Sequence, residues 1–188
     1  GGGNEARRVF DDTNAVYEAT KVTVEANTKI DASAIENGDG GTVVVWSDVN
    51  NPDSVTSVAG EILAKGGEKG GDGGQVETSG RQLKLDGASV STLAADGSAG
   101  DWLLDPGNTE IRAAGTVTSI TNDYEAPNSP TVIQTSAIVS ALDANNVEIT
   151  TGTGGEYTLI VDDPIQYTGS SERTLTFGAT HRVLVYQN

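Results

Sequence analysis

Residues 66–80 read GGEKGGDGGQVETSG, and seven of these fifteen residues are glycine. Such a run can be a flexible linker, a phosphate-binding loop, a calcium loop or one corner of a repeated structure. The stretch 29–48, KIDASAIENGDGGTVVVWSD, has the same layout as 61–80, EILAKGGEKGGDGGQVETSG. Each has a short apolar strand, a Gly-Asp-Gly-Gly turn and a second strand. A linker has no reason to keep that order, so the pattern favours a repeated corner.

A looser third copy follows at 88–106, ASVSTLAADGSAGDWLLDP, where Val90 takes the place of Ile30 and Ile62. One strand–turn–strand unit cannot bury its apolar residues alone, whereas stacked copies share a core. We therefore expect an all-β chain that forms a β-solenoid, with a β-sandwich as the alternative. The corner glycines, at which we expect positive φ angles and close backbone approach, are Gly40, Gly41, Gly73 and Gly74.

Apolar residues alternate within the candidate strands, as at Val43 and Val45, so one face of each strand should point inward. Short strands are expected around Ile30, Ile62 and Val90. The other predicted strands are 22–25, 42–47, 75–79, 82–85, 102–104, 109–112, 116–120, 147–150, 157–161, 174–177 and 183–186.

The segment 129–146 has a different period. Ile138, Val139 and Leu142 are spaced as on one face of a helix, with Thr135 or Ser136 as the N-cap and Asn145–Asn146 as the stop. We expect a short helix across one face of the rod, and a protruding loop at 121–130 ahead of it. The whole chain 1–188 is then a single β-helical segment, in which the placement of 1–18 stays open.

The chain has a net charge of −16. This charge disfavours binding to nucleic acid or to anionic lipid, because either would add repulsion. No apolar run approaches the roughly 18 residues needed to span a bilayer, so no membrane insertion is expected. The absence of cysteine fits either a reducing compartment or a protein exported unfolded through an oxidising space. The opening GGGNEARR, with neither Met nor signal peptide, predicts an internal segment of a longer protein.

Candidates for metal binding and catalysis are few, and we expect no cofactor and no catalytic residue. His181 is the only histidine. Asp39, Asp72 and Asp96 lie in glycine turns and are the weak candidates for calcium, although the nine-residue period of calcium-binding β-rolls is absent. A phosphate-binding loop needs a helix after its glycines, whereas the predicted strand QVETSG follows here.

Two alternatives to a structural role involve sugars. Paired carboxylates can hydrolyse glycosidic bonds, which allows a carbohydrate-active β-helix enzyme. Exposed aromatic side chains can stack on sugar rings, which allows a glycan-binding module without turnover. Trp46 and Trp102 are expected to pack at corners, so Tyr124 in the polar loop is the candidate for ligand contact. The carboxylate candidates are Asp11–Asp12 and Asp162–Asp163, with Glu156 nearby.

Several stretches taken in order resemble the internal repeat region of filamentous-haemagglutinin-like adhesins, the large exoproteins of bacterial two-partner secretion. They are GDGGTVVVWSD (38–48), ILAKGGEKGGDGGQVETSG (62–80), GDWLLDPGNTEI (100–111), IVSALDANNVEITTG (138–152) and YTLIVDDPIQYTGSSERTLTFGA (157–179). The similarity covers most of the chain from about Ala19 onward, while 1–18 matches only loosely.

The resemblance implies a right-handed parallel β-helix, secreted to the surface of a Gram-negative bacterium through an outer-membrane transporter partner. It also favours the export interpretation of the missing cysteine, because the family generally avoids that residue. No catalytic residue is carried over. We therefore predict a monomeric, non-enzymatic rod that contributes to adhesion to a host receptor, a surface or a glycan.

Overall fold

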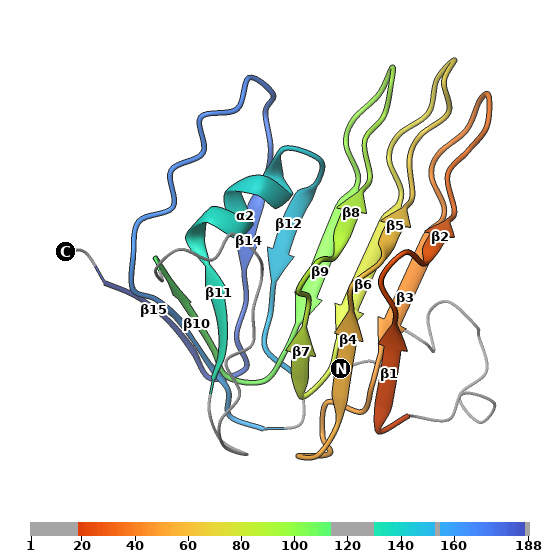
Figure 1. Ribbon diagram of the computed structural model, residues 1–188. Helices are drawn as coiled ribbons and strands as arrows, with labels where there is room; N and C mark the ends of the chain where they lie inside the picture. Colours follow the sequence, from red (N-terminus) through yellow and green to blue (C-terminus); the bar gives the residue numbers. More distant parts are fainter. Residues whose placement is uncertain (1–18, 114–129, 153–154, 187–188) are drawn as a thin grey trace.

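The computed structural model describes residues 19–113, 130–152 and 155–186, and the regular secondary structure of this part is β-strand apart from one short helix. The first nine strands form three repeats of three strands each (Figure 1). Repeat 1 contains β1 (Lys21–Val24), β2 (Lys29–Asp31) and β3 (Thr42–Trp46). Repeat 2 contains β4 (Val55–Val58), β5 (Glu61–Leu63) and β6 (Gln75–Ser79). Repeat 3 contains β7 (Gln82–Lys84), β8 (Ser89–Ser91) and β9 (Asp101–Asp105).

Each strand of one repeat pairs in parallel with the equivalent strand of the next repeat. This gives the sheets β1–β4–β7 and β2–β5–β8, and the first three strands of the sheet β3–β6–β9–β12–β14. The offset proposed from the sequence is confirmed, because Ile30 lies opposite Ile62 and Ile62 lies opposite Val90. The prediction of a mainly β chain is confirmed as well, and its sheets are parallel.

The remaining strands either extend the third sheet or form a fourth sheet. They are β10 (Thr109–Arg112), β11 (Thr131–Gln134), β12 (Asn146–Ile149), β13 (Thr158–Val161), β14 (Leu175–Phe177) and β15 (Arg182–Val185). Strand β12 pairs with β9 and with β14, whereas β10, β11, β13 and β15 form a fourth parallel sheet in the order β11–β10–β13–β15. Helix α2 (Thr135–Leu142) connects β11 to β12, where the earlier repeats have β2, β5 and β8.

The core consists of columns of inward-pointing side chains that run from repeat to repeat. One column in the third sheet is Val43, Val76, Trp102, Val147 and Leu175. Its neighbours two residues along are Val45, Thr78, Leu104, Ile149 and Phe177. Because the strands are parallel and in register, each buried side chain lies above its counterpart.

Two strands were missed in the sequence, β4 and β11, and both ends of the helix differ from the prediction. The predicted N-caps Thr135 and Ser136 lie inside the first turn, and the N-cap is Gln134, which makes no side-chain cap hydrogen bond. The helix ends at Leu142, ahead of the predicted stop. The expected strand 116–120, most of the expected loop at 121–130 and the segment 1–18 lie outside the described residues. No helix in the described part of the chain is long and apolar enough to cross a membrane.

Candidate functional site: the stacked loops

Three loops project together beyond the strands (Figure 1). Loop 1 (32–41) joins β2 to β3, loop 2 (64–74) joins β5 to β6, and loop 3 (92–100) joins β8 to β9. Their backbones continue the sheet hydrogen bonding outward. Gly38 N donates to Gly70 O at 2.9 Å and Lys69 N donates to Glu36 O at 2.7 Å, and Gly73 N in loop 2 donates to Ser98 O at 2.9 Å. The loops therefore form one projecting wall.

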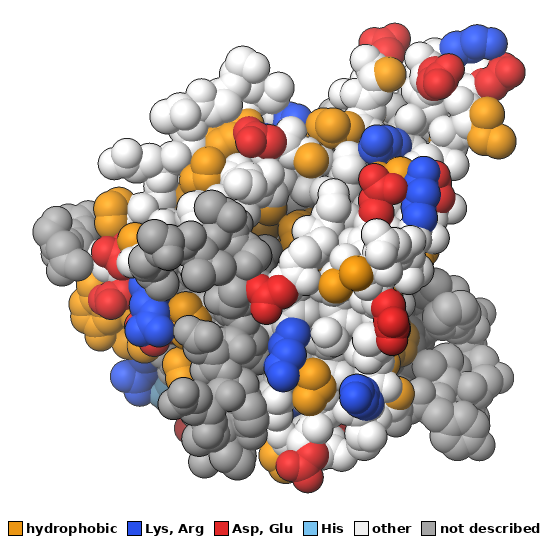
Figure 2. All heavy atoms as spheres, viewed as in Figure 1, with side chains coloured by type: hydrophobic (Ala, Val, Ile, Leu, Met, Phe, Trp, Pro, Cys, Tyr) orange, Lys and Arg blue, Asp and Glu red, His pale blue; other side chains and the backbone are white. Residues whose placement is uncertain are grey.

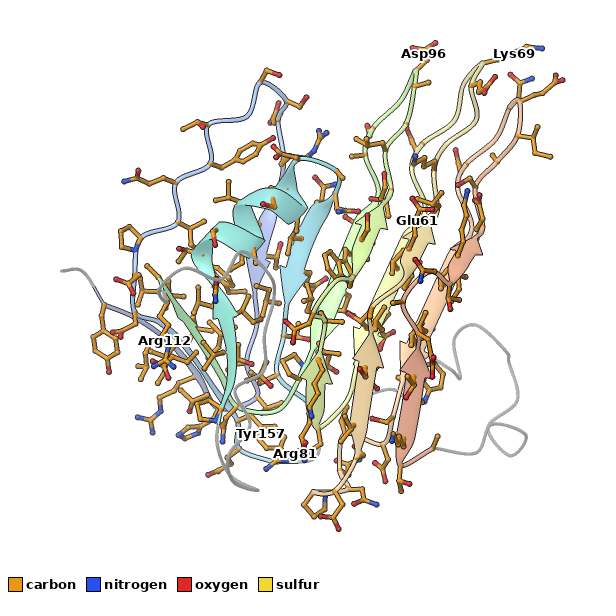
Figure 3. The ribbon with its side chains drawn as sticks, in the orientation of Figure 1. Glu61, Lys69, Arg81, Asp96, Arg112 and Tyr157 are labelled. Carbon is orange, nitrogen blue, oxygen red and sulfur yellow. The ribbon has the colours of Figure 1, made fainter. Side chains whose placement is uncertain are left out.

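Aspartate side chains join the loops of this wall. Asp39 Oδ1 accepts a hydrogen bond from Asp72 N at 2.8 Å, and Asp72 Oδ1 accepts one from Ser98 N at 2.8 Å. Two of the three weak calcium candidates are thus acceptors for the backbone of the following loop. Asp96 lies at the tip of loop 3 (Figure 3). Within the described residues, no group of three or more His, Cys, Asp or Glu side chains is placed to hold a metal ion.

Exposed ion pairs line the outer surface of the β2–β5–β8 sheet and of its loops. Lys29 Nζ lies 3.1 Å from Asp31 Oδ2 and 3.9 Å from Glu61 Oε2. In the wall, Lys69 Nζ lies 3.0 Å from Glu36 Oε2. Hydrogen bonds from Ser33, with a further one from Lys29, lower the pKa of Asp31 to about 2. Figure 2 shows acidic and basic side chains interspersed over the visible face and at the loop tips.

The corner glycines are required by close packing and not by their φ angles. A Cβ on Gly40 would lie 2.2 Å from Ala64 O, one on Gly73 would lie 1.7 Å from Thr92 O, and one on Gly74 would lie 2.1 Å from Gly41 O. Gly41 is less confined, since its Cβ would lie 3.0 Å from Ala32 O. The expectation of positive φ at these four positions was wrong. Among the described glycines, those with positive φ are Gly38, Gly70, Gly71 and Gly87.

A buried hydroxyl cluster, which the sequence did not reveal, lies where the first and third sheets meet. Thr56 Oγ1 donates to Ser79 O at 2.7 Å and lies 3.0 Å from Ser47 Oγ. Ser47 Oγ lies 3.3 Å from Ser54 Oγ, and Ser54 Oγ donates to Asp48 O. These residues are fully buried except for Asp48. The hydroxyl groups hydrogen-bond to one another and to backbone carbonyl groups, so each of these buried polar groups has a partner.

A cation–π contact lies at the opposite end of the strands from the loops. The Arg81 guanidinium lies over the ring of Tyr157, 4.7 Å from its centroid (Figure 3). The contact joins repeat 3 to the chain that leads into β13. The Tyr157 ring is therefore packed against the Arg81 side chain.

The other candidates that the structure describes form no group of three or more acidic or histidine side chains. Asp163 Oδ2 accepts a hydrogen bond from Ala113 N at 2.7 Å, so this carboxylate caps the end of β10. Glu156 and His181 are exposed. Trp102 is buried and its Nε1 donates to Thr78 Oγ1 at 3.0 Å, whereas Trp46 is half-buried. Tyr124 and the pair Asp11–Asp12 lie outside the described residues.

No known family model matches the chain, and a search of curated proteins finds no match either. The resemblance to two-partner-secretion adhesins therefore stays a prediction. What the structure supplies is a wall of stacked loops with exposed charges of both signs and with the exposed apolar side chains of Ile35 in loop 1 and Leu93 in loop 3. Such a surface can present side chains to a partner.

Proposed function

We propose that this chain is a segment of a right-handed parallel β-solenoid that forms the shaft of a secreted bacterial adhesin. The observation that carries the proposal is the pairing of each strand with the strand three places further along the chain, in parallel, through three repeats. Parallel strands joined by crossovers are right-handed in nearly all proteins. With this strand order, further repeats can be added to the end of a rod through the same strand pairing.

Side-chain hydrogen bonds between repeats support the same function. Backbone N–H groups of one repeat donate to side chains of the preceding one, as Lys65 does to Ser33 Oγ at 3.0 Å and Asp72 does to Asp39 Oδ1 at 2.8 Å. The pattern recurs near the end of the described chain, where Thr174 N donates to Asn146 Oδ1 at 3.0 Å. Each repeat thus offers fixed acceptors to the one that follows, which suits a shaft that must stay stiff.

Charge and composition support a role outside the cell. The net charge of −16 keeps such rods soluble and apart from one another. A chain without cysteine cannot be trapped by a premature disulfide while it crosses an oxidising space. Within this proposal, the parent protein leaves the cell through an outer-membrane two-partner-secretion transporter. It then folds at the cell surface and contributes to adhesion to a host receptor, a surface or a glycan.

The test is a binding screen of the folded segment against immobilised glycans and matrix proteins, with a reducing-end assay on polysaccharides in parallel. The proposal expects no release of reducing ends, and any ligand found should bind without being altered. Turnover that is lost on Asp163→Asn, with the fold intact by circular dichroism, would replace the adhesin proposal with a carbohydrate-active enzyme.

A further inference from the structure

The tips of the three stacked loops carry equivalent dipeptides. Asp39 contacts Asp72 at an offset of 33 residues, and Asp72 contacts Ser98 at an offset of 26 residues. Applying these two offsets to Asn37 gives Gly70 and then Asp96. The tips are therefore Asn37–Gly38 in loop 1, Gly70–Gly71 in loop 2 and Asp96–Gly97 in loop 3.

Asn-Gly is the dipeptide in which the next backbone nitrogen most easily reaches the side-chain amide, because glycine has no Cβ to hinder the approach. Asn37 is exposed, and its side chain makes no hydrogen bond within the described part of the chain. Gly38 has a φ of 118° and open space around the position of a Cβ. The Asn37 side chain is thus open to solvent, and Gly38 has no Cβ that would hinder the attack.

We propose that Asn37–Gly38 is a deamidation site whose reaction is held in check by the stacking of loop 1 on loop 2. In this reaction Gly38 N attacks Asn37 Cγ, the N–Cγ bond forms, and the Cγ–Nδ2 bond breaks. The proton of Gly38 N leaves with the amide nitrogen as ammonia. Water then opens the cyclic imide at either carbonyl, giving aspartate or isoaspartate at position 37. This inference is independent of the adhesin proposal.

The stacked loops restrain the attacking nitrogen. Gly38 N donates to Gly70 O at 2.9 Å, and the same stretch of loop 1 is held by Gly67 N donating to Gly38 O at 3.0 Å. Lys69 N also donates to Glu36 O at 2.7 Å. The attack requires rotation of the Asn37–Gly38 peptide and loss of the bond to Gly70, so loop 2 must first separate from loop 1. The reaction rate then reports local opening of the wall.

The two products have different structural consequences. Aspartate at position 37 gives loop 1 the Asp-Gly tip that loop 3 already has at Asp96–Gly97. Isoaspartate adds a methylene to the backbone between Glu36 O and Gly38 O, the two acceptors that loop 2 contacts through Lys69 N and Gly67 N. One extra backbone atom shifts the two acceptors out of register, so loop 1 can no longer stack on loop 2.

The experiment follows deamidation by peptide mapping at mildly alkaline pH, in folded protein and in urea. We expect reaction in the folded protein to be at least about tenfold slower, since it requires local opening. Gly71→Ala should raise the rate toward the urea value, because its Cβ would lie 2.0 Å from Gly38 O and would separate the loops. The control is Gly87→Ala, which is also at a positive φ but lies in the β7–β8 turn.

Equal rates in folded protein and in urea would overturn the proposal, as would equal acceleration by Gly71→Ala and Gly87→Ala. If Gly71→Ala does not fold, the comparison of deamidation rates between the folded unsubstituted protein and the same protein in urea still tests the proposal. A second readout separates the products. Asn37→Asp should keep the hydrogen-exchange protection of the Gly67 and Lys69 amides, whereas the purified isoaspartyl form should lose it. Full protection in the isoaspartyl form would contradict the argument about register.

Discussion

At the scale of the residue, Gly73 shows how tightly the repeats approach one another. A Cβ at this position would lie 1.7 Å from Thr92 O and 2.3 Å from Gly100 N, both of which belong to the backbone and cannot rotate away. We expect Gly73→Ala to lower the free energy of unfolding by about 2–4 kcal/mol through overpacking. Urea denaturation monitored by circular dichroism measures this change.

The matched control for this substitution is Gly107→Ala. Its Cβ would meet the Arg81 Nη1 atom at 2.8 Å, which is the far end of a flexible side chain. We expect the free energy of unfolding of Gly107→Ala to fall by less than about 1 kcal/mol, because the arginine side chain can move aside. Equal losses in the two alanine variants would show that backbone approach is not what requires glycine at position 73.

Two adjacent valines of β3 test which face of the strand points inward. Val43 is buried, whereas Val44 is half-exposed and lies opposite Glu77. Threonine has nearly the shape of valine, so it changes polarity without opening a cavity. We expect Val43→Thr to cost about 1–2 kcal/mol of unfolding free energy and Val44→Thr to cost less than about 0.5 kcal/mol. A larger loss for Val44→Thr in thermal denaturation would show that the register of β3 is reversed.

At the scale of the element, the strands that were predicted are those with apolar residues at alternate positions. Strand β3 has Val43 and Val45 inward, and its bounds were predicted to within one residue. Strand β4 was missed because Thr56 occupies a buried position that an apolar residue would hold, and its hydroxyl bonds to Ser79 O. A buried threonine with a distant partner has no signature in the local sequence.

Strand β11 was missed for a different reason. All four of its residues, 131–134, are buried, so the strand shows no alternation between apolar and polar positions. The apolar residues of α2 follow directly, and the combined segment has the period of a helix. Helix α2 itself was predicted correctly because its spacing continues for two turns. The start of the helix was predicted wrongly, because the helix begins directly after β11 at Gln134, an N-cap that makes no side-chain hydrogen bond.

Asn145 joins helix α2 to strand β8 and makes the position of the helix testable. It is fully buried, its Oδ1 accepts from Thr92 N at 3.0 Å, and its Nδ2 donates to Val90 O at 3.1 Å and to Ala141 O at 2.9 Å. The amide thus provides hydrogen-bond partners for the backbone at and just after β8, beyond which the described residues add no further strand to that sheet. We expect Asn145→Ala to lower the free energy of unfolding by about 2–4 kcal/mol, because several buried polar groups lose a hydrogen-bond partner.

The comparison for this variant is Thr135→Ala at the N-cap position suggested by the sequence. Since Gln134 is the N-cap and lacks a side-chain cap hydrogen bond, that change should alter the unfolding free energy by less than about 0.5 kcal/mol. Both values come from chemical denaturation. A loss above 1 kcal/mol for Thr135→Ala would mean that the threonine does cap the helix.

At the scale of the whole molecule, the sequence predicted that the glycine turns repeat but not what their aspartates do. Asp39 and Asp72 were weak candidates for calcium, and in the structure each accepts a hydrogen bond from the next loop. The first of these hydrogen bonds joins residues 33 positions apart, and the second joins residues 26 positions apart. Local sequence rules describe turns within one loop, so a contact between equivalent loops follows only once the stacking register is known.

The two ends of the stack differ in how well their inward-pointing residues are covered. In the first repeat Val24, Val43 and Val45 are 9%, 8% and 6% exposed, whereas Val183 and Val185 of β15 are 37% and 63% exposed. Strand β15 pairs only with β13 in the described residues, so little apolar burial holds it. We expect its amides to exchange hydrogen through local opening at a lower free energy than those of β6 and β9.

A pair of substitutions distinguishes a loosely held end from a loosely held sheet. Val161 lies opposite Val185 in the same sheet but is only 6% exposed. We expect Val161→Thr to lower the free energy of unfolding by about 1–2 kcal/mol, while Val185→Thr should lower it by less than about 0.5 kcal/mol, because threonine at the exposed position 185 stays hydrated. Equal losses, or protection of β15 as strong as that of β6, would show that β15 is covered in solution.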